Sequence, residues 1–249
     1  MRTFIIGDIH GCYKELNQLY TYLVEKVGFL PKEDKIIFLG DYVDRGPDCK
    51  SVIDLCLQIK KTCAHTVFLK GNHEDMLLAF LDLGGQYGDA YMMNGGGKFF
   101  ASYKGPDGKL PLDYDIKSGM SKYNILQALP KEHLDFLLNL ELIHIQDKYI
   151  AVHAGIDPDM TLAQQTPNVL LWIRDYFYSQ IVVKPIGKLI IHGHTPVEKV
   201  CFDLPHRIML DTGCVFDGRL SCLELNEDDP IQSKIYFIEK NGNSVKMSF

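Results

Sequence analysis

The 249-residue chain lacks the long apolar segments and the basic excess that mark two large classes of protein. No run of about 18 apolar residues occurs, so no segment is expected to span a membrane. Asp and Glu (32) outnumber Lys and Arg (26), and the formal net charge is −6. Because a protein that grips a nucleic-acid backbone needs a basic face, nucleic acid is not expected as its partner.

The cysteines carry no disulfide or zinc signature. They are seven, an odd number, and include no C-x-x-C pair. The first residues, 1–8, contain too few apolar side chains for the core of a secretory signal. Free thiols and a cytoplasmic location are therefore expected. Cys12 directly follows a polar motif discussed below, which leaves open whether activity is sensitive to oxidation.

With 46% hydrophobic and 23% charged residues, the composition is that of an ordinary globular protein. Three short β-rich runs, 2–6, 35–39 and 66–69, each end in a polar, glycine-containing block and are followed by apolar residues at helical spacing. This order, βαβαβα, predicts an α/β fold with parallel strands.

Two features of the remaining sequence bear on domain organisation. Around 84–130 the periodicity fails amid glycine-rich turns, which predicts a loop-rich insertion or lid. From residue 188 onward four strands are predicted without helices between them. No linker or repeat is visible, so 1–249 is predicted to form a single domain.

Five polar blocks stand just after predicted strands and hold the candidate functional residues. Residues beyond the carboxyl ends of parallel strands converge on one crevice, so blocks far apart in sequence can meet there. In chain order the blocks contain Asp8 and His10; Asp41, Asp44 and Arg45; Asn72 and His73; His153; and His192 and His194.

The residue types in these blocks predict a metal centre. Oxygen and nitrogen donors without thiolate suit manganese, iron or zinc better than calcium. The donors are numerous enough for two ions that share a carboxylate, and such a pair is the usual device for in-line displacement at phosphorus. Hydrolysis of a phosphate ester is the chemistry that this pattern favours.

The motifs also resemble a known family. Gly7-Asp8-Ile9-His10-Gly11, Gly40-Asp41-Tyr42-Val43-Asp44-Arg45-Gly46, Gly71-Asn72-His73-Glu74, His153-Ala154-Gly155 and His192-Gly193-His194-Thr195-Pro196 are similar, in order, to the motifs of the calcineurin-like metallophosphoesterases. Within that superfamily they resemble the phosphoprotein phosphatase branch, in particular its bacterial and bacteriophage members. The Ser-Ala-Pro-Asn-Tyr segment of the eukaryotic enzymes is missing. The resemblance implies two mixed β-sheets packed as a sandwich flanked by α-helices.

The resemblance further implies a role for each motif residue. One metal ion would be held by Asp8, His10 and Asp41, and a second by Asp41, Asn72, His153 and His194. Arg45 and Arg174 would bind phosphoryl oxygens, and a bridging hydroxide would attack the phosphorus. His73 would protonate the leaving group, while Asp44 would orient the imidazole and favour its protonated form.

Three functions remain open at this stage. Metal-dependent hydrolysis of phosphoserine or phosphothreonine in proteins is the main prediction. The alternative is a symmetrical diadenosine tetraphosphatase or another nucleotide polyphosphate hydrolase, which would share the metal motifs. A non-catalytic metal-binding scaffold is the alternative from another class, although it would have no use for His73 and Asp44. Manganese is the expected metal, with iron and zinc open, and the sequence does not predict the oligomeric state.

Overall fold

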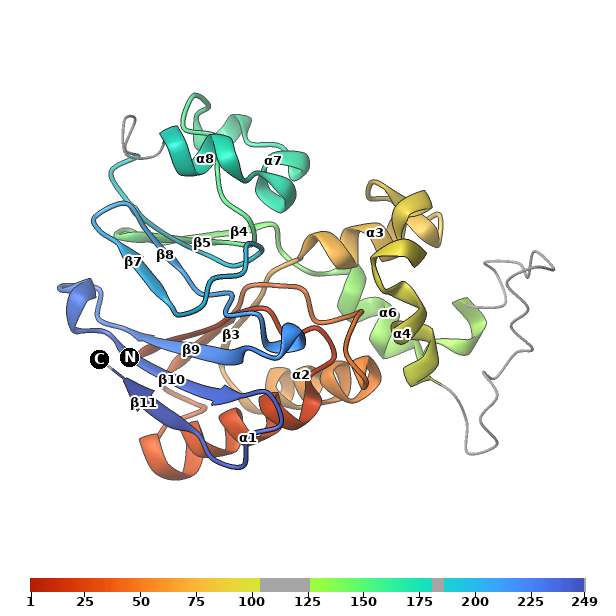
Figure 1. Cartoon of the computed structure of the whole chain (residues 1–249), viewed down its shortest axis with the longest axis horizontal. Coiled ribbons are helices and arrows are strands. Elements are labelled where there is room, and N and C mark those ends of the chain that lie inside the picture. Colours follow the sequence, from red (N-terminus) through yellow and green to blue (C-terminus); the bar gives the residue numbers. More distant parts are fainter. Residues whose placement is uncertain (104–125, 181–185, 249) are drawn as a thin grey trace.

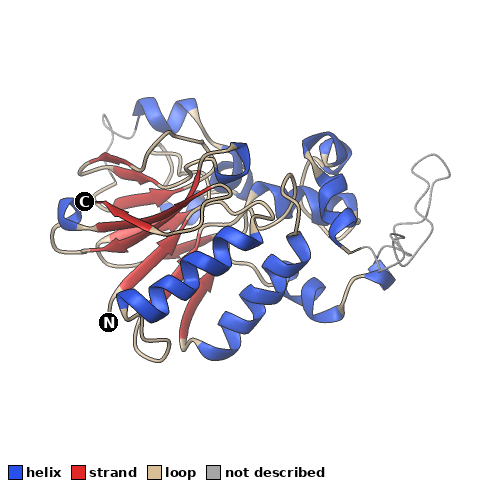
Figure 2. Cartoon of the chain, turned by 60° about the horizontal axis from the view of Figure 1, so that its bottom comes forward, coloured by secondary structure: helices blue, strands red, loops and turns tan. Residues whose placement is uncertain are grey.

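The computed structural model describes residues 1–103, 126–180 and 186–248. In this structure two mixed β-sheets pack face to face, and helices cover both outer faces (Figures 1 and 2). The predicted sandwich of two mixed sheets flanked by helices is confirmed.

The first sheet has the strand order β11-β10-β9-β1-β2-β3. Its strands are β1 (Thr3–Ile6), β2 (Lys35–Phe38), β3 (His65–Phe68), β9 (Arg219–Leu225), β10 (Lys234–Glu239) and β11 (Lys246–Ser248). The first three are parallel. Strand β9 pairs antiparallel with β1, β10 with β9, and β11 with β10. They alternate with helices α1 (Tyr13–Tyr22), α2 (Cys49–Thr62) and α3 (Asn72–Phe80), which confirms the predicted βαβαβα order.

The second sheet has the order β4-β5-β6-β8-β7. Its strands are β4 (Ile143–Ile145), β5 (Tyr149–Val152), β6 (Leu189–His192), β7 (Cys201–Asp203) and β8 (Arg207–Met209), of which β5, β6 and β8 are parallel. The four strands predicted after residue 188 correspond to β6, β8, β9 and β10. Strands β4, β7 and β11 were not predicted, because each has only three residues and none of these is buried, whereas two of the three residues of β8 are buried.

Alternation along the central strands builds a core on each face of both sheets. In β1, Ile5 lies in the core between the sheets, whereas Phe4 and Ile6 lie in the core beneath α1 and α2. In β5, Ala151 faces the first sheet and Val152 the outer helices. Since both faces are buried, these strands appear in the sequence as unbroken apolar runs.

Local signals explain where several helices begin and end. Helix α1 continues through a π-helical turn, η1 (Leu23–Val27), and stops at Gly28, whose φ of 73° is left-handed. Helix α7 (Pro167–Trp172) starts after Thr166, whose side chain accepts a hydrogen bond from the Val169 amide. Helices α6 (Lys131–Leu138) and α8 (Asp175–Gln180) complete the outer layers.

The predicted insertion is described in its first part. Residues 84–103 form two 3-10 turns, η2 (Gly88–Ala90) and η3 (Met92–Asn94), and helix α4 (Gly96–Ser102). Buried side chains such as Tyr91 and Phe99 attach this segment to the main core. The remainder of the predicted lid, 104–125, lies outside the described residues, so the lid and the single-domain organisation stay predictions. Within the described ranges, no helix combines the length and apolar character that a membrane crossing needs.

Candidate metal centre

The five polar blocks meet at the carboxyl ends of β1, β2, β3, β5 and β6, and much of their backbone is strained. Nine described residues other than glycine have a positive φ. Five of them belong to the blocks: His10, Asp41, Asp44, Arg45 and His194. Left-handed backbone at such residues persists only where the surroundings fix it, and it gathers at functional sites. The fold therefore maintains unusual conformations in order to aim these side chains.

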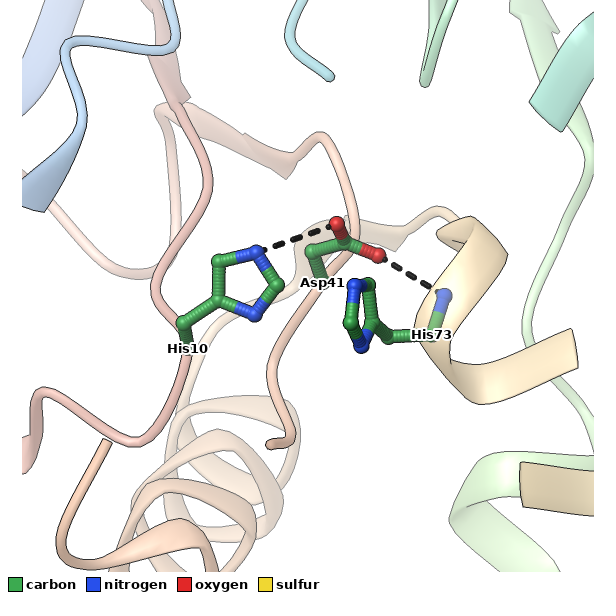
Figure 3. Close-up of side chains that lie close together, drawn as sticks. All are labelled: His10, Asp41 and His73. Carbon is green, nitrogen blue, oxygen red and sulfur yellow. Dashed lines mark hydrogen bonds and ion pairs between the residues drawn. The ribbon is translucent and has the colours of Figure 1, made fainter. Parts of the chain in front are cut away.

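Asp41 joins the blocks that follow β1, β2 and β3. Its Oδ2 lies 3.2 Å from Nε2 of His10, and its Oδ1 accepts the backbone amide of His73 at 3.1 Å (Figure 3). His10 donates Nδ1–H to the Val43 carbonyl at 2.8 Å, which leaves Nε2 directed at the carboxylate. Burial raises the pKa of Asp41, but the neighbouring imidazoles of His153, His73 and His10 outweigh burial and keep it well below its usual range.

A second group of donors faces the other oxygen of Asp41. His153 donates Nδ1–H to the Leu39 carbonyl at 2.9 Å, so its Nε2 carries a lone pair. That nitrogen lies 3.0 Å from Oδ1 of Asn72 and 3.6 Å from Asp41 Oδ1. Burial lowers the pKa of His153, which keeps the imidazole neutral. Two acceptors that face each other repel unless a cation lies between them.

His194 and Asp8 bring polar atoms that nothing else in the described part of the chain satisfies. His194 Nδ1 lies 2.9 Å from Asn72 Oδ1, while its Nε2 is buried without a hydrogen-bond partner among the described residues. Oδ2 of Asp8 accepts the His194 amide at 3.0 Å, and Oδ1 is equally without a described partner. Unpaired buried polar atoms are costly, so their coincidence here indicates a ligand.

The charge balance points the same way. Burial, followed by the charges of Asp211 and Asp41, raises the pKa of Asp8 well above its usual range. Five acids in and around the site are at most 5% exposed: Asp8, Asp41, Asp44, Glu74 and Asp211. Buried carboxylates in this number need cations. The oxygen and nitrogen donors, free of thiolate, fit a pair of divalent ions of the manganese, iron or zinc type.

Next to the donors lies a buried pair, Asp44 and His73. Asp44 Oδ2 is 2.7 Å from Nδ1 of His73, and Asp44 Oδ1 accepts the hydroxyl of Tyr91 at 2.7 Å. Burial lowers the pKa of His73 to about 3 and raises that of Asp44 to about 8. Burial disfavours the charged form of both groups. The contact between Asp44 Oδ2 and His73 Nδ1 is the one that the predicted orienting role of Asp44 needs, and that role and the protonated state of His73 stay predictions.

The two predicted phosphate-binding arginines lie at different margins of the site. Arg45 brings Nη1 to within 2.9 Å of His10 Nε2. Arg174 is exposed and donates Nη1–H to the hydroxyl of Thr195 at 3.0 Å, next to His194. The Arg45 guanidinium thus contacts a proposed metal ligand directly, and the Arg174 guanidinium contacts the residue next to one.

Two functional features escaped the sequence analysis in different ways. Glu74, part of the third motif but given no role, accepts the backbone amides of Asp41, Tyr42, Val43 and Gly71 at 2.8–3.1 Å and so ties two of the motif loops together. Tyr91 comes from the irregular insertion, where no pattern pointed to it.

Two motif glycines are required by close approach. A Cβ at Gly193 would lie 2.0 Å from Asp8 Oδ1, and one at Gly71 would lie 2.1 Å from Asp41 Oδ1. Any side chain at either position would displace a carboxylate of the donor set.

A two-sheet sandwich with oxygen and nitrogen donors gathered at its strand ends defines a metal-dependent phosphoesterase. Residues 1–228 match the family described as calcineurin-like phosphoesterase, and the chain belongs to this family. A relative in Geobacillus thermodenitrificans (strain NG80-2), named bis(5'-nucleosyl)-tetraphosphatase PrpE [asymmetrical], is 29% identical over 259 residues and covers 91% of each chain.

Solved structures agree with this fold. One, provisionally described as a diadenosine tetraphosphatase, superposes with a TM-score of 0.63 at 21% identity and covers 96% of this chain and 93% of its own. A cold-active protein tyrosine phosphatase gives a TM-score of 0.58 at 18% identity and covers 99% of this chain and 78% of its own. At these identities the likeness concerns the fold alone.

The comparisons confirm the predicted superfamily and its use of divalent metals. They do not support the narrower prediction of a serine/threonine protein phosphatase, because the full-length relatives carry the name of a nucleotide tetraphosphatase. The alternative that the sequence left open agrees better with them.

Proposed function

We propose that this protein hydrolyses dinucleoside polyphosphates, and that it cleaves them asymmetrically. The observation that carries the substrate class is the end-to-end similarity to the PrpE tetraphosphatases, which extends over 91% of both chains. The donor geometry supports the reaction type, since it combines a cation site with two nearby guanidinium groups. The asymmetrical mode replaces the symmetrical one named at the outset, and it follows the relatives' name.

The proposed metal ligands are those that the motifs suggest. Bound divalent ions would supply Lewis-acid stabilisation of the phosphate charge and activate the attacking water. One ion would be held by Asp8, His10 and Asp41, and the other by Asp41, Asn72, His153 and His194. Supporting this assignment, Asp41 lies in two groups of close donor atoms, one with His10 and His73 and the other with His153 and His194.

The remaining residues bind phosphate and handle a proton. Arg45 and Arg174 can each offer two parallel N–H donors to phosphate oxygens. Because Nδ1 of His73 is engaged by Asp44, Nε2 is the ring nitrogen available to a leaving oxygen. Its proton can pass to that oxygen while Asp44 keeps the imidazole ring oriented.

A substrate panel tests the proposal. The manganese-loaded protein is assayed on diadenosine tetraphosphate and on peptides that carry phosphoserine, phosphothreonine or phosphotyrosine. We expect kcat/KM for the dinucleotide to exceed that for every peptide by at least about a hundredfold, roughly 2.7 kcal/mol in the transition state. Anion-exchange separation of the products then distinguishes AMP plus ATP from two molecules of ADP.

A preference for the phosphopeptides would support the protein phosphatase function instead. ADP as the sole nucleotide product would show that cleavage is symmetrical. Asp41→Asn and Asn72→Ala serve as site variants, each expected to lose at least one bound metal ion in direct metal analysis. If wild-type protein binds metal and hydrolyses no phosphate compound in the panel, the scaffold alternative stands.

A further inference from the structure

Two aromatic side chains at the metal centre are more exposed than their chemistry favours. Phe216 is 58% exposed and Tyr87 is 53% exposed. Single exposed apolar side chains are common on protein surfaces and by themselves need no explanation. These two, however, each contact a side chain that touches a proposed metal ligand.

Phe216 lies on the Arg45 side of the centre. The Arg45 guanidinium carbon is 5.2 Å from the centre of the Phe216 ring, and Arg45 in turn reaches His10 at 2.9 Å. The ring stands on a short turn, η5 (Cys214–Phe216), that is closed by a hydrogen bond from the Phe216 amide to the Gly213 carbonyl. Left-handed backbone on both sides of η5 and the buried Cys214 fix this turn. The backbone that carries the exposed ring is therefore fixed by the fold.

Tyr87 lies on the His194 side. Its ring meets Trp172 edge to face with the centroids 4.9 Å apart, and Trp172 stands 6.2 Å from the His194 ring. The Tyr87 hydroxyl donates to Asn168 Oδ1 at 3.1 Å, which connects the turn before η2 to helix α7. Tyr87 has a φ of 61°, a conformation that is rare for a bulky residue. Strain at this position indicates that the surroundings impose the placement of the ring.

The two aromatic platforms, Phe216 on Arg45 and Tyr87 on Trp172, approach the donor set through different ligands. Phe216 does so through Arg45 and His10, and Tyr87 through Trp172 and His194. The molecule therefore presents two exposed aromatic rings, each one side chain away from a proposed metal ligand.

We propose that each platform stacks one nucleobase of a dinucleoside polyphosphate whose phosphate chain crosses the metal centre. This inference rests on the proposed function and specifies how that site selects its substrate. Aromatic side chains stack on any base, because every base has a π-face, and such contacts add affinity without demanding a particular base. A phosphoprotein substrate has no group that would occupy both rings.

Substitutions that remove the rings test the proposal. Phe216→Leu and Tyr87→Leu keep an apolar side chain but cannot stack, whereas Phe216→Tyr and Tyr87→Phe keep the ring. The measured quantity is the ratio of kcat/KM for diadenosine tetraphosphate to kcat/KM for p-nitrophenyl phosphate, which lacks a base. Each leucine variant should lower this ratio about 5- to 150-fold, and the aromatic variants should stay near wild type.

Ile231→Ala provides the matched control. Ile231 is 59% exposed, and it lies in η6 (Pro230–Gln232), between β9 and β10 at the sheet edge opposite the motif loops. The substitution Ile231→Ala removes an apolar side chain that is about as exposed as the two rings but does not lie near either platform. Its ratio should equal that of the wild type.

Binding gives a readout that needs no turnover. Trp172 is the only tryptophan of the chain, so its fluorescence reports on the Tyr87 platform and on the adjacent His194. In the manganese-loaded wild-type protein, AMP should quench this fluorescence and bind about 5- to 150-fold more tightly than ribose 5-phosphate, which lacks the base. Tyr87→Leu should abolish the difference.

Equal affinity for AMP and ribose 5-phosphate, or leucine variants with an unchanged selectivity ratio, would overturn the platforms. Failure of the proposed function is recognised separately, because then the wild-type protein itself does not hydrolyse diadenosine tetraphosphate, whatever AMP does to the fluorescence of Trp172.

Discussion

Replacing Tyr91 by phenylalanine removes one hydroxyl from the buried chain of contacts that ends on His73. In the structure this hydroxyl donates to Asp44 Oδ1 at 2.7 Å, and Asp44 Oδ2 contacts Nδ1 of His73 at the same distance. Tyr91 and Asp44 are both 0% exposed, so water cannot take the place of the lost donor without a rearrangement. We therefore expect Tyr91→Phe to loosen the orientation of Asp44 and, through it, of His73.

The size of the effect follows from the kind of hydrogen bond. A buried acceptor that loses its donor costs about 1–3 kcal/mol. If the whole amount appears in the transition state, kcat falls roughly 5- to 150-fold. The fall should be largest for leaving groups that need a proton, so phenyl phosphate should suffer more than p-nitrophenyl phosphate, whose leaving group is a weaker base.

Tyr103→Phe is the matched control. Tyr103 is also buried and caps the C-terminal end of helix α4 in the same segment. A hydrogen bond of 2.8 Å joins its hydroxyl to Nδ1 of His133, away from the donor set. It should lose comparable thermal stability and keep its turnover rate. Steady-state kinetics on the two aryl phosphates, together with thermal unfolding of both variants, make the comparison.

Equal losses of kcat on the two aryl phosphates in Tyr91→Phe would refute the reasoning, because they would show that the hydroxyl does not act through proton transfer. A Tyr103→Phe variant that loses as much turnover as Tyr91→Phe would do so as well, since the effect would then be a general loss of stability.

Three further predictions concern the donor set and the pH dependence of stability. Gly193→Ala should reduce the bound metal, measured by mass spectrometry of the dialysed protein, because the new Cβ would lie 2.0 Å from Asp8 Oδ1; a variant with the wild-type metal content would contradict the crowding argument. Removal of metal with a chelator should lower the melting temperature, and manganese should restore it. At a manganese concentration a hundred times Kd, the free energy of unfolding should rise by about 2.7 kcal/mol. A melting temperature that does not change on removal of the metal would contradict the idea that metal ions offset the buried acids. Burial, against the opposing charge of Asp54, leaves the pKa of His133 below its ordinary 6.5, so its contribution to stability is present above pH 6.5 and is lost as the pH falls below it. His133→Gln should therefore show a smaller drop in urea midpoint from pH 7.5 to 5.5 than wild type does, and identical drops would refute this.

Local patterns were sufficient for the secondary structure wherever a segment was long or had a cap. The apolar runs that became β1 and β2 were recognised because both of their faces are buried. The three-residue strands β4, β7 and β11 were missed, since only pairing with a neighbouring strand makes them regular.

The sequence by itself determined the family, the sandwich fold and the candidate site residues. They could be recognised because each strand-end motif consists of residues only a few positions apart. Only the tertiary structure decided how those residues act on one another. It placed Tyr91 on Asp44, which no local spacing can encode across 47 positions. It also buried Asp44 and His73, which raises the pKa of the first and lowers that of the second, since desolvation depends on everything packed around a group. The exposed rings of Phe216 and Tyr87 could be proposed as base-stacking platforms only from the tertiary structure, because folding places them beside Arg45 and Trp172.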